Sequence, residues 1–131
     1  MHSVVIADTS CLILFSKIDL LELLRKLYAA VMITPEVSDE FGEELPSWID
    51  IRPARKSSIE SLEKYKLGKG EIASLALALD LKDSTVILDD EKEKKIARQL
   101  HLNVTGSLGI IVKGKFSARC KGYFKGYFKQ D

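Results

Sequence analysis

Five carboxylates in this 131-residue chain are spaced so that they can act together on one ligand. Asp8 follows the apolar run VVIA at 4–7, and Asp89 follows TVIL at 85–88, with Asp90 beside it; Glu40 and Glu71 stand between. Converging carboxylates raise one another's pKa unless a cation neutralises them, and a cluster without His or Cys suits Mg²⁺ or Mn²⁺. Such an ion lowers the pKa of a bound water and stabilises an attacked phosphodiester. The indicated chemistry is phosphodiester hydrolysis.

The same positions also have a structural interpretation. Asp8 and the two hydroxyl residues after it fit the cap of a helix that begins near Ser10. Glu71 and Asp90 fit the starts of helices, where a negative charge is favourable with the helix dipole. Position alone therefore leaves both interpretations open.

The elements that must hold these acids alternate between apolar runs and helical periods. The runs predict strands at 4–7, 31–34, 49–52, 85–88 and 103–105, and the periods predict helices at 18–30, 35–44, 58–68, 70–82, 89–101 and 107–114. Short apolar strands separated by helices indicate a parallel sheet covered on both faces. We predict an α/β fold with three α/β/α layers and a central, mainly parallel sheet of four to five strands. Ligands in such folds lie beyond the carboxyl ends of the strands.

Length and composition indicate one ordinary globular domain, with 46% hydrophobic and 30% charged residues. The opening MHSVVIAD has no basic region before its short apolar run, which argues against a signal peptide. No stretch approaches the roughly 18 apolar residues of a membrane span. We expect a cytoplasmic protein with no membrane partner.

Charge is distributed unevenly along the chain. Residues 1–112 carry 14 Lys/Arg and 18 Asp/Glu, whereas residues 113–131 carry 6 and 1. KGYF occurs twice in tandem, at 121–124 and 125–128. We therefore divide the chain into a domain at 1–113 and a basic, aromatic tail at 114–131. The tail is either an altered end that packs poorly or a nucleic-acid arm, since Lys attracts phosphate and aromatic rings stack on bases.

Five segments together resemble a known family. They are IADTSCLI at 6–13, TPEVSDEF at 34–41, GKGEIASLALAL at 68–79, VILDDEKEKKIARQL at 86–100 and VTGSLGII at 104–111. In this order they resemble the PIN-domain nucleases, most closely the prokaryotic branch with the VapC-like toxin ribonucleases. The resemblance implies a PIN-like fold and an endoribonuclease that depends on Mg²⁺ or Mn²⁺.

The resemblance also implies roles for single residues. The four catalytic and metal-binding acids fall on Asp8, Glu40, Glu71 and Asp89, with Asp90 as an adjacent candidate ligand. The hydroxyl residue that supports the first acid falls on Ser10. Many toxins have Asp at the third position, so the longer Glu71 favours water-mediated coordination there.

Basic residues near these acids are the candidates for contact with RNA: Lys69, Lys94, Lys95 and Arg98. The run EKEKK at 91–95 is otherwise interpreted as a solvated helix face. The family resemblance implies the toxin of a toxin–antitoxin pair, held in check by a small antitoxin protein, and a homodimer. The alternative is a PIN-fold protein with weak or no catalysis that binds RNA or a partner.

Overall fold

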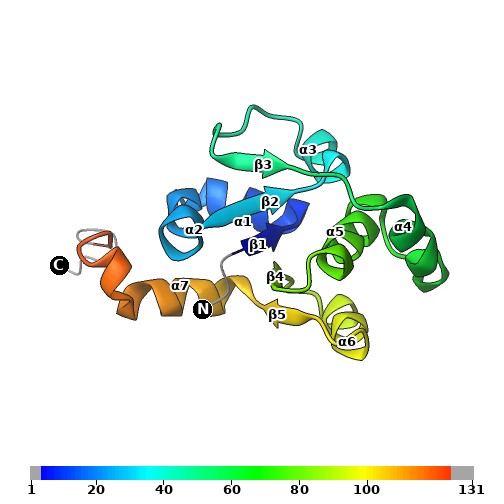
Figure 1. Ribbon diagram of the computed structural model, residues 1–131. Coiled ribbons are helices and arrows are strands. Elements are labelled where there is room, and N and C mark those ends of the chain that lie inside the picture. The colour runs from blue at the N-terminus through cyan, green and yellow to red at the C-terminus, as the bar shows by residue number, and fades with distance from the viewer. Residues whose placement is uncertain (1–3, 125–131) are drawn as a thin grey trace.

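The computed structural model describes residues 4–124, which form a central sheet with helices on both faces (Figure 1). Its five strands are β1 (Val4–Ala7), β2 (Ala30–Ile33), β3 (Ile49–Ile51), β4 (Ser84–Ile87) and β5 (Asn103–Thr105). They pair in the order β3-β2-β1-β4-β5, and every pair is parallel. The predicted fold class is confirmed.

Helices connect these strands. They are α1 (Thr9–Lys17), α2 (Leu21–Leu27), α3 (Pro35–Phe41), α4 (Lys56–Leu62), α5 (Lys69–Asp80), α6 (Glu91–Gln99) and α7 (Ser107–Phe116), with short 3-10 turns η1 (Glu63–Tyr65) and η2 (Ala118–Cys120). Helix α3 illustrates how the sequence sets their limits. The Thr34 hydroxyl accepts a hydrogen bond from the Val37 N–H, Pro35 occupies the first turn, and Gly42 ends the helix at φ +69°.

Two apolar clusters fill the space between the layers. Val5 and Ala7 of β1 face the cluster under α1, α2 and α7, whereas Ile6 faces the cluster under α4, α5 and α6. Successive side chains of a strand point to opposite faces, so a strand covered on both sides must be apolar at every position. This is why VVIA shows no alternation.

One predicted helix is wrong in its limits. The stripe at 18–30 predicts a single helix, but the chain forms α1 up to Lys17 and begins α2 only at Leu21. Asp19 adopts φ +57° between them, a left-handed conformation that no α-helix continues through. Leucine spacing alone did not reveal this break.

The C-terminal part packs on α2. At Gly114 of α7 an added Cβ would lie 2.6 Å from Cδ1 of Leu23, so glycine lets the two helices approach closely. Beyond α7, Cys120 is 3% exposed, and Tyr123 and Phe124 pack against the first cluster. The first KGYF copy is thus packed, and the second copy lies outside the described residues. The boundary at residue 113 stays a prediction; α7 crosses that position.

None of the helices within residues 4–124 has the length and apolar character that a membrane crossing requires.

Candidate active site

The carboxyl ends of β1 and β4 meet at one edge of the sheet. Ala7 is paired with Ile87, Asp8 follows Ala7 directly, and Asp89 lies two residues beyond Ile87. The two strands are neighbours in the sheet. After β1 the chain continues to β2 on one side of this pair, and after β4 it continues to β5 on the other side. Such a switch in strand order opens a crevice for ligands at the strand ends.

Asp8 is a buried carboxylate held at a helix start. Its side chain is 7% exposed, and its Oδ1 accepts a hydrogen bond from the Cys11 N–H at 2.9 Å, which caps α1. The capping interpretation of Asp8 is therefore confirmed. Burial raises its pKa to about 6; the Cys11 N–H opposes the rise, and the negative charges of Asp89 and Glu71 add to it. Capping alone does not require so much negative charge around one carboxylate.

Glu40 reaches the same place from the last turn of α3. Its Oε1 accepts a hydrogen bond from the Thr9 hydroxyl at 2.7 Å, across 31 positions of the chain. A Cβ on Gly70 would overlap that same oxygen. Glycine at position 70 is therefore required for the Glu40 carboxylate to stay where it is. Thr9 and Gly70 are thus positioning residues that the sequence analysis did not select.

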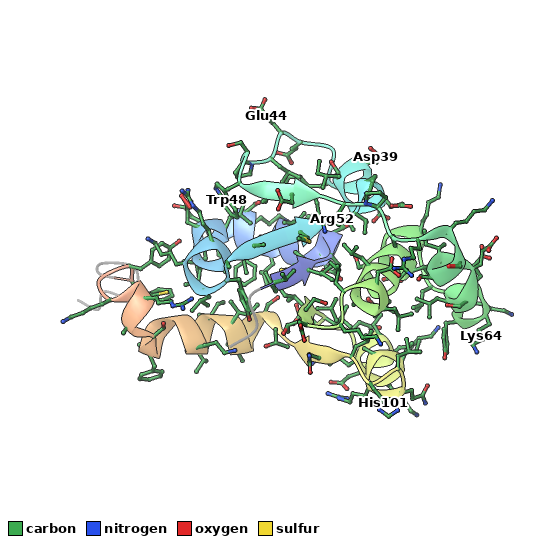
Figure 2. The ribbon with its side chains drawn as sticks, in the orientation of Figure 1. Asp39, Glu44, Trp48, Arg52, Lys64 and His101 are labelled. Atoms are coloured by element: carbon green, nitrogen blue, oxygen red, sulfur yellow. The ribbon has the colours of Figure 1, made fainter. Side chains whose placement is uncertain are left out.

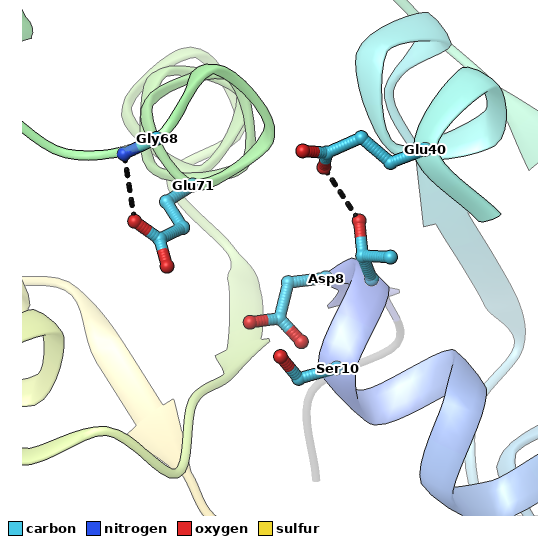
Figure 3. A pocket seen from close by; sticks show the side chains of 6 residues that line it. Asp8, Ser10, Glu40, Gly68 and Glu71 are labelled. Atoms are coloured by element: carbon cyan, nitrogen blue, oxygen red, sulfur yellow. Dashed lines mark hydrogen bonds between the residues drawn. The ribbon is translucent and has the colours of Figure 1, made fainter.

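Glu71 completes a cavity of about 250 Å³. Its Oε1 accepts a hydrogen bond from the Gly68 N–H at 2.8 Å, which fixes the side chain over the start of α5. The carboxylates of Asp8, Glu40 and Glu71 point into this cavity, and the Ser10 hydroxyl is turned toward Asp8 (Figure 3). Three of the predicted acids and the predicted supporting hydroxyl therefore line one cavity.

Asp89 and Asp90 lie beside this cavity and do not line it. Asp89 accepts hydrogen bonds from the N–H and the hydroxyl of Ser107, at 2.8 and 2.6 Å, which tie it to the start of α7. Asp90 caps α6 by accepting from the Glu93 N–H at 3.2 Å. Asp89 remains close enough to raise the pKa of Asp8.

Glu93 is a sixth acid at the site, and the interpretation of 91–95 as a solvated face is wrong there. Its side chain is 4% exposed, and its Oε1 has no hydrogen-bond partner. Burial raises its pKa well above the ordinary range of a glutamate, and the negative charges of Glu71 and Asp8 add to the rise. Ile96 and Ala97, three and four positions later, are buried on the same helix face. This spacing is the sequence signal from which the burial of Glu93 could have been predicted.

Comparison with protein families bears on this acidic cavity. The family model DUF3368, a PIN domain, matches residues 4–121. The chain belongs to the PIN-domain family. No match to a curated protein was found. PIN domains are generally nucleases that bind nucleic acid and use divalent metal ions.

Two of the four predicted basic residues, Lys69 and Lys94, lie near the acidic edge of this PIN domain. Lys69 is exposed in the first turn of α5, next to the cavity residue Gly68. Lys94 is half-buried, pairs with Glu91 at 3.6 Å, and lies near Gly106, which adjoins Asp89. Lys95 and Arg98 are exposed on α6. The cationic candidates thus come from α5 and α6, the two helices that carry Glu71 and Glu93.

The donor chemistry of this PIN domain fits a divalent ion, although the side chains are not gathered around one. Within residues 4–124, no three Asp, Glu, His or Cys side chains are arranged as a metal site. Glu40, Glu71 and Asp89 are instead engaged by hydroxyls and backbone N–H groups. Carboxylate oxygens are the ligands that Mg²⁺ and Mn²⁺ prefer, and the unpartnered buried Oε1 of Glu93 adds a further carboxyl oxygen. The residues therefore fit a hard cation in type and charge.

Proposed function

We propose that this protein is an endoribonuclease that depends on Mg²⁺ or Mn²⁺ and hydrolyses RNA phosphodiesters at the cavity of Asp8, Glu40 and Glu71. The observation that supports the proposal is a buried Asp8 with a pKa raised to about 6 beside further carboxylates. A structural cap gains nothing from such repulsion, whereas a cation-binding site requires concentrated negative charge.

In this proposal Asp8, Glu40, Glu71 and Asp89 hold the ion, with Asp90 as an adjacent candidate. The ion supplies neutralisation of the phosphate and a lowered pKa for a bound water. Thr9 and Ser107 orient Glu40 and Asp89 through their hydroxyls, at 2.7 and 2.6 Å. Lys69, Lys94, Lys95 and Arg98 attract the phosphates of the RNA to an otherwise acidic edge.

The test is cleavage of a pool of single-stranded and structured RNAs by the purified chain with Mn²⁺ or Mg²⁺. We expect cleavage that disappears with EDTA and in Asp8→Asn, a variant whose amide still caps α1. Asp50→Asn, the same change at an exposed position of β3, is the matched control and should retain activity. Cleavage by Asp8→Asn at the rate of Asp50→Asn would exclude the proposed site.

A second candidate is a PIN-fold module that binds RNA or a partner with little catalysis. It is favoured by one observation: Glu40, Glu71 and Asp89 already accept hydrogen bonds, and no three acids of the described residues are gathered as a metal site. Calorimetric titration with Mn²⁺ separates the two candidates. Binding that is lost in Asp8→Asn supports the nuclease, and no binding supports the module.

We extend the proposal to a toxin role, with a small antitoxin whose basic segment fills the acidic cavity, and to a homodimer. The supporting observation is the charge complementarity between such a segment and the carboxylates that line the cavity. Induced expression should arrest growth with the native chain and not with Asp8→Asn. Light scattering tests the dimer, and a mass near the monomer's 14.7 kDa would remove it.

A further inference from the structure

A second hollow lies at the other end of α7 from the acidic site. It is a groove of about 690 Å³ whose lining includes Lys115, Phe116, Ser117, Cys120, Lys121 and Phe124. Helix α7 begins at Ser107, which binds Asp89, and ends at Phe116 in the groove. At 1.5 Å per residue the helix separates the two places by roughly 14 Å. Figure 1 shows the η2 end of the chain on the far side of α2 from α5 and α6.

The groove is cationic. Residues 113–124 include Lys113, Lys115, Arg119 and Lys121 and no acid, in contrast to the net negative charge of residues 1–112. Helix α2 adds Lys26, whose Nζ lies 5.4 Å from the centroid of the Tyr123 ring. Helix α2 packs against η2, and Arg119 and Lys121 are the chain neighbours of the lining residue Cys120. Positive groups from two elements therefore gather at this groove.

The groove also presents an aromatic ring to solvent. Phe116 is 81% exposed, although phenylalanine is a residue that proteins usually bury. Phe124, also in the lining, is held edge-on against Tyr123, with ring centroids 5.2 Å apart. One ring is thus anchored by packing, while the other is open to a ligand.

We propose that this groove binds single-stranded RNA, with a base stacked on Phe116 and a phosphate bound by Lys121. Exposed aromatic rings beside lysines match both parts of a single strand, because an unpaired base offers a face for stacking and each nucleotide carries a negative phosphate. A duplex keeps its bases stacked inside and offers no face to Phe116. The choice of RNA over DNA rests on the proposed function, whereas the groove itself shares no residue with the acidic cavity.

The test measures binding of a fluorescein-labelled oligouridine to the full chain by anisotropy, in EDTA and at several salt concentrations. Phe116→Ala should weaken binding roughly 5- to 150-fold, the effect of losing one stacked base. Lys121→Gln should weaken binding and reduce the magnitude of the salt slope by about 0.7, the value for one phosphate of a single strand. A duplex of the same length should bind equally to the native chain and to Phe116→Ala.

Two exposed residues elsewhere provide matched controls. Leu108 is 73% exposed on the same helix and outside the groove, so Leu108→Ala removes a similar apolar group without removing the stack. Lys64 lies on the opposite side of the molecule from α7 (Figure 2), so Lys64→Gln removes a charge away from the groove. Both controls should bind the oligonucleotide as the native chain does. All four positions are exposed, and thermal melting checks that each variant folds.

Three results would overturn the assignment. The first is that the native chain fails to bind the oligonucleotide in EDTA. The second is that Phe116→Ala and Lys121→Gln bind it as tightly as their controls. The third is that light scattering finds a dimer which Phe116→Ala dissociates without weakening RNA binding, since the groove would then be a contact between two copies. The assay contains no metal, so its outcome is independent of whether the acidic cavity cleaves RNA.

Discussion

The burial of Asp8 makes a quantitative prediction about stability without metal. The folded-state pKa is raised from 3.8 to about 6, so the folded protein holds a proton that the unfolded chain releases between these values. Because the folded state binds more protons in that window, stability falls as pH rises through it. At about 1.36 kcal/mol for each pKa unit, the loss above pH 6 amounts to about 3 kcal/mol.

Asp8→Asn removes this loss while preserving the cap. The amide oxygen still accepts from the Cys11 N–H, since Asn caps helices as well as Asp does. The variant should therefore exceed the native chain in free energy of unfolding by less than about 1 kcal/mol near pH 4 and by about 3 kcal/mol near pH 8. Loss of the Asp8 charge also lowers the raised pKa of Glu93, which adds to the stability difference at the alkaline end in the same direction.

Urea unfolding followed by circular dichroism, in EDTA across this pH range, measures the difference directly. Asp50→Asn is the control, and its difference from the native chain should not depend on pH in this way, because that side chain is exposed on β3. A difference for Asp8→Asn that stays constant from pH 4 to pH 8, or that changes sign, would refute the electrostatic account of the site.

Three further substitutions test the packing around the acids and between α7 and α2. Gly70→Ala should displace the Glu40 carboxylate from Thr9 and reduce metal-dependent cleavage with little change in melting temperature, because the added methyl meets only the end of a flexible side chain. Ser107→Ala should lower the free energy of unfolding by about 1 kcal/mol in urea titrations and weaken Mn²⁺ binding by calorimetry, since Asp89 keeps only its backbone partner. Gly114→Ala should cost about 1 to 3 kcal/mol by the same titration, because the methyl would overlap the leucine of α2 behind α7.

The sequence predicted the parts of the site that follow directly from strand position. Asp8 and Asp89 stand just beyond buried apolar runs, and a parallel sheet brings such ends together whatever the intervening chain does. Glu71 could be predicted as readily, because the side chain of a glutamate in the first turn of a helix has few favourable orientations. The strand ends and helix starts that the sequence pattern marks were enough to select these acids.

Other parts depended on packing that no local pattern encodes. The contact between Thr9 and Glu40 spans 31 positions and exists because α1 and α3 lie side by side, while Gly70 leaves room for it. Glu93 was hidden within a charged run, and only its spacing from Ile96 indicates the buried face. Asp19 separates α1 from α2 through its backbone conformation, which side-chain hydrophobicity does not record.

The position of β1 has a consequence for the timing of synthesis. This strand is made before the other four strands of the sheet but lies in its middle, and its β4 neighbour begins only at Ser84. Asp8 therefore leaves the ribosome about 80 residues before Asp89, and Ser107 follows later still. At roughly 5 to 20 residues per second, several seconds pass in which the nascent chain carries the first acid without the rest of the site. A nascent chain of this protein thus has no assembled acidic site until about 80 further residues have followed Asp8.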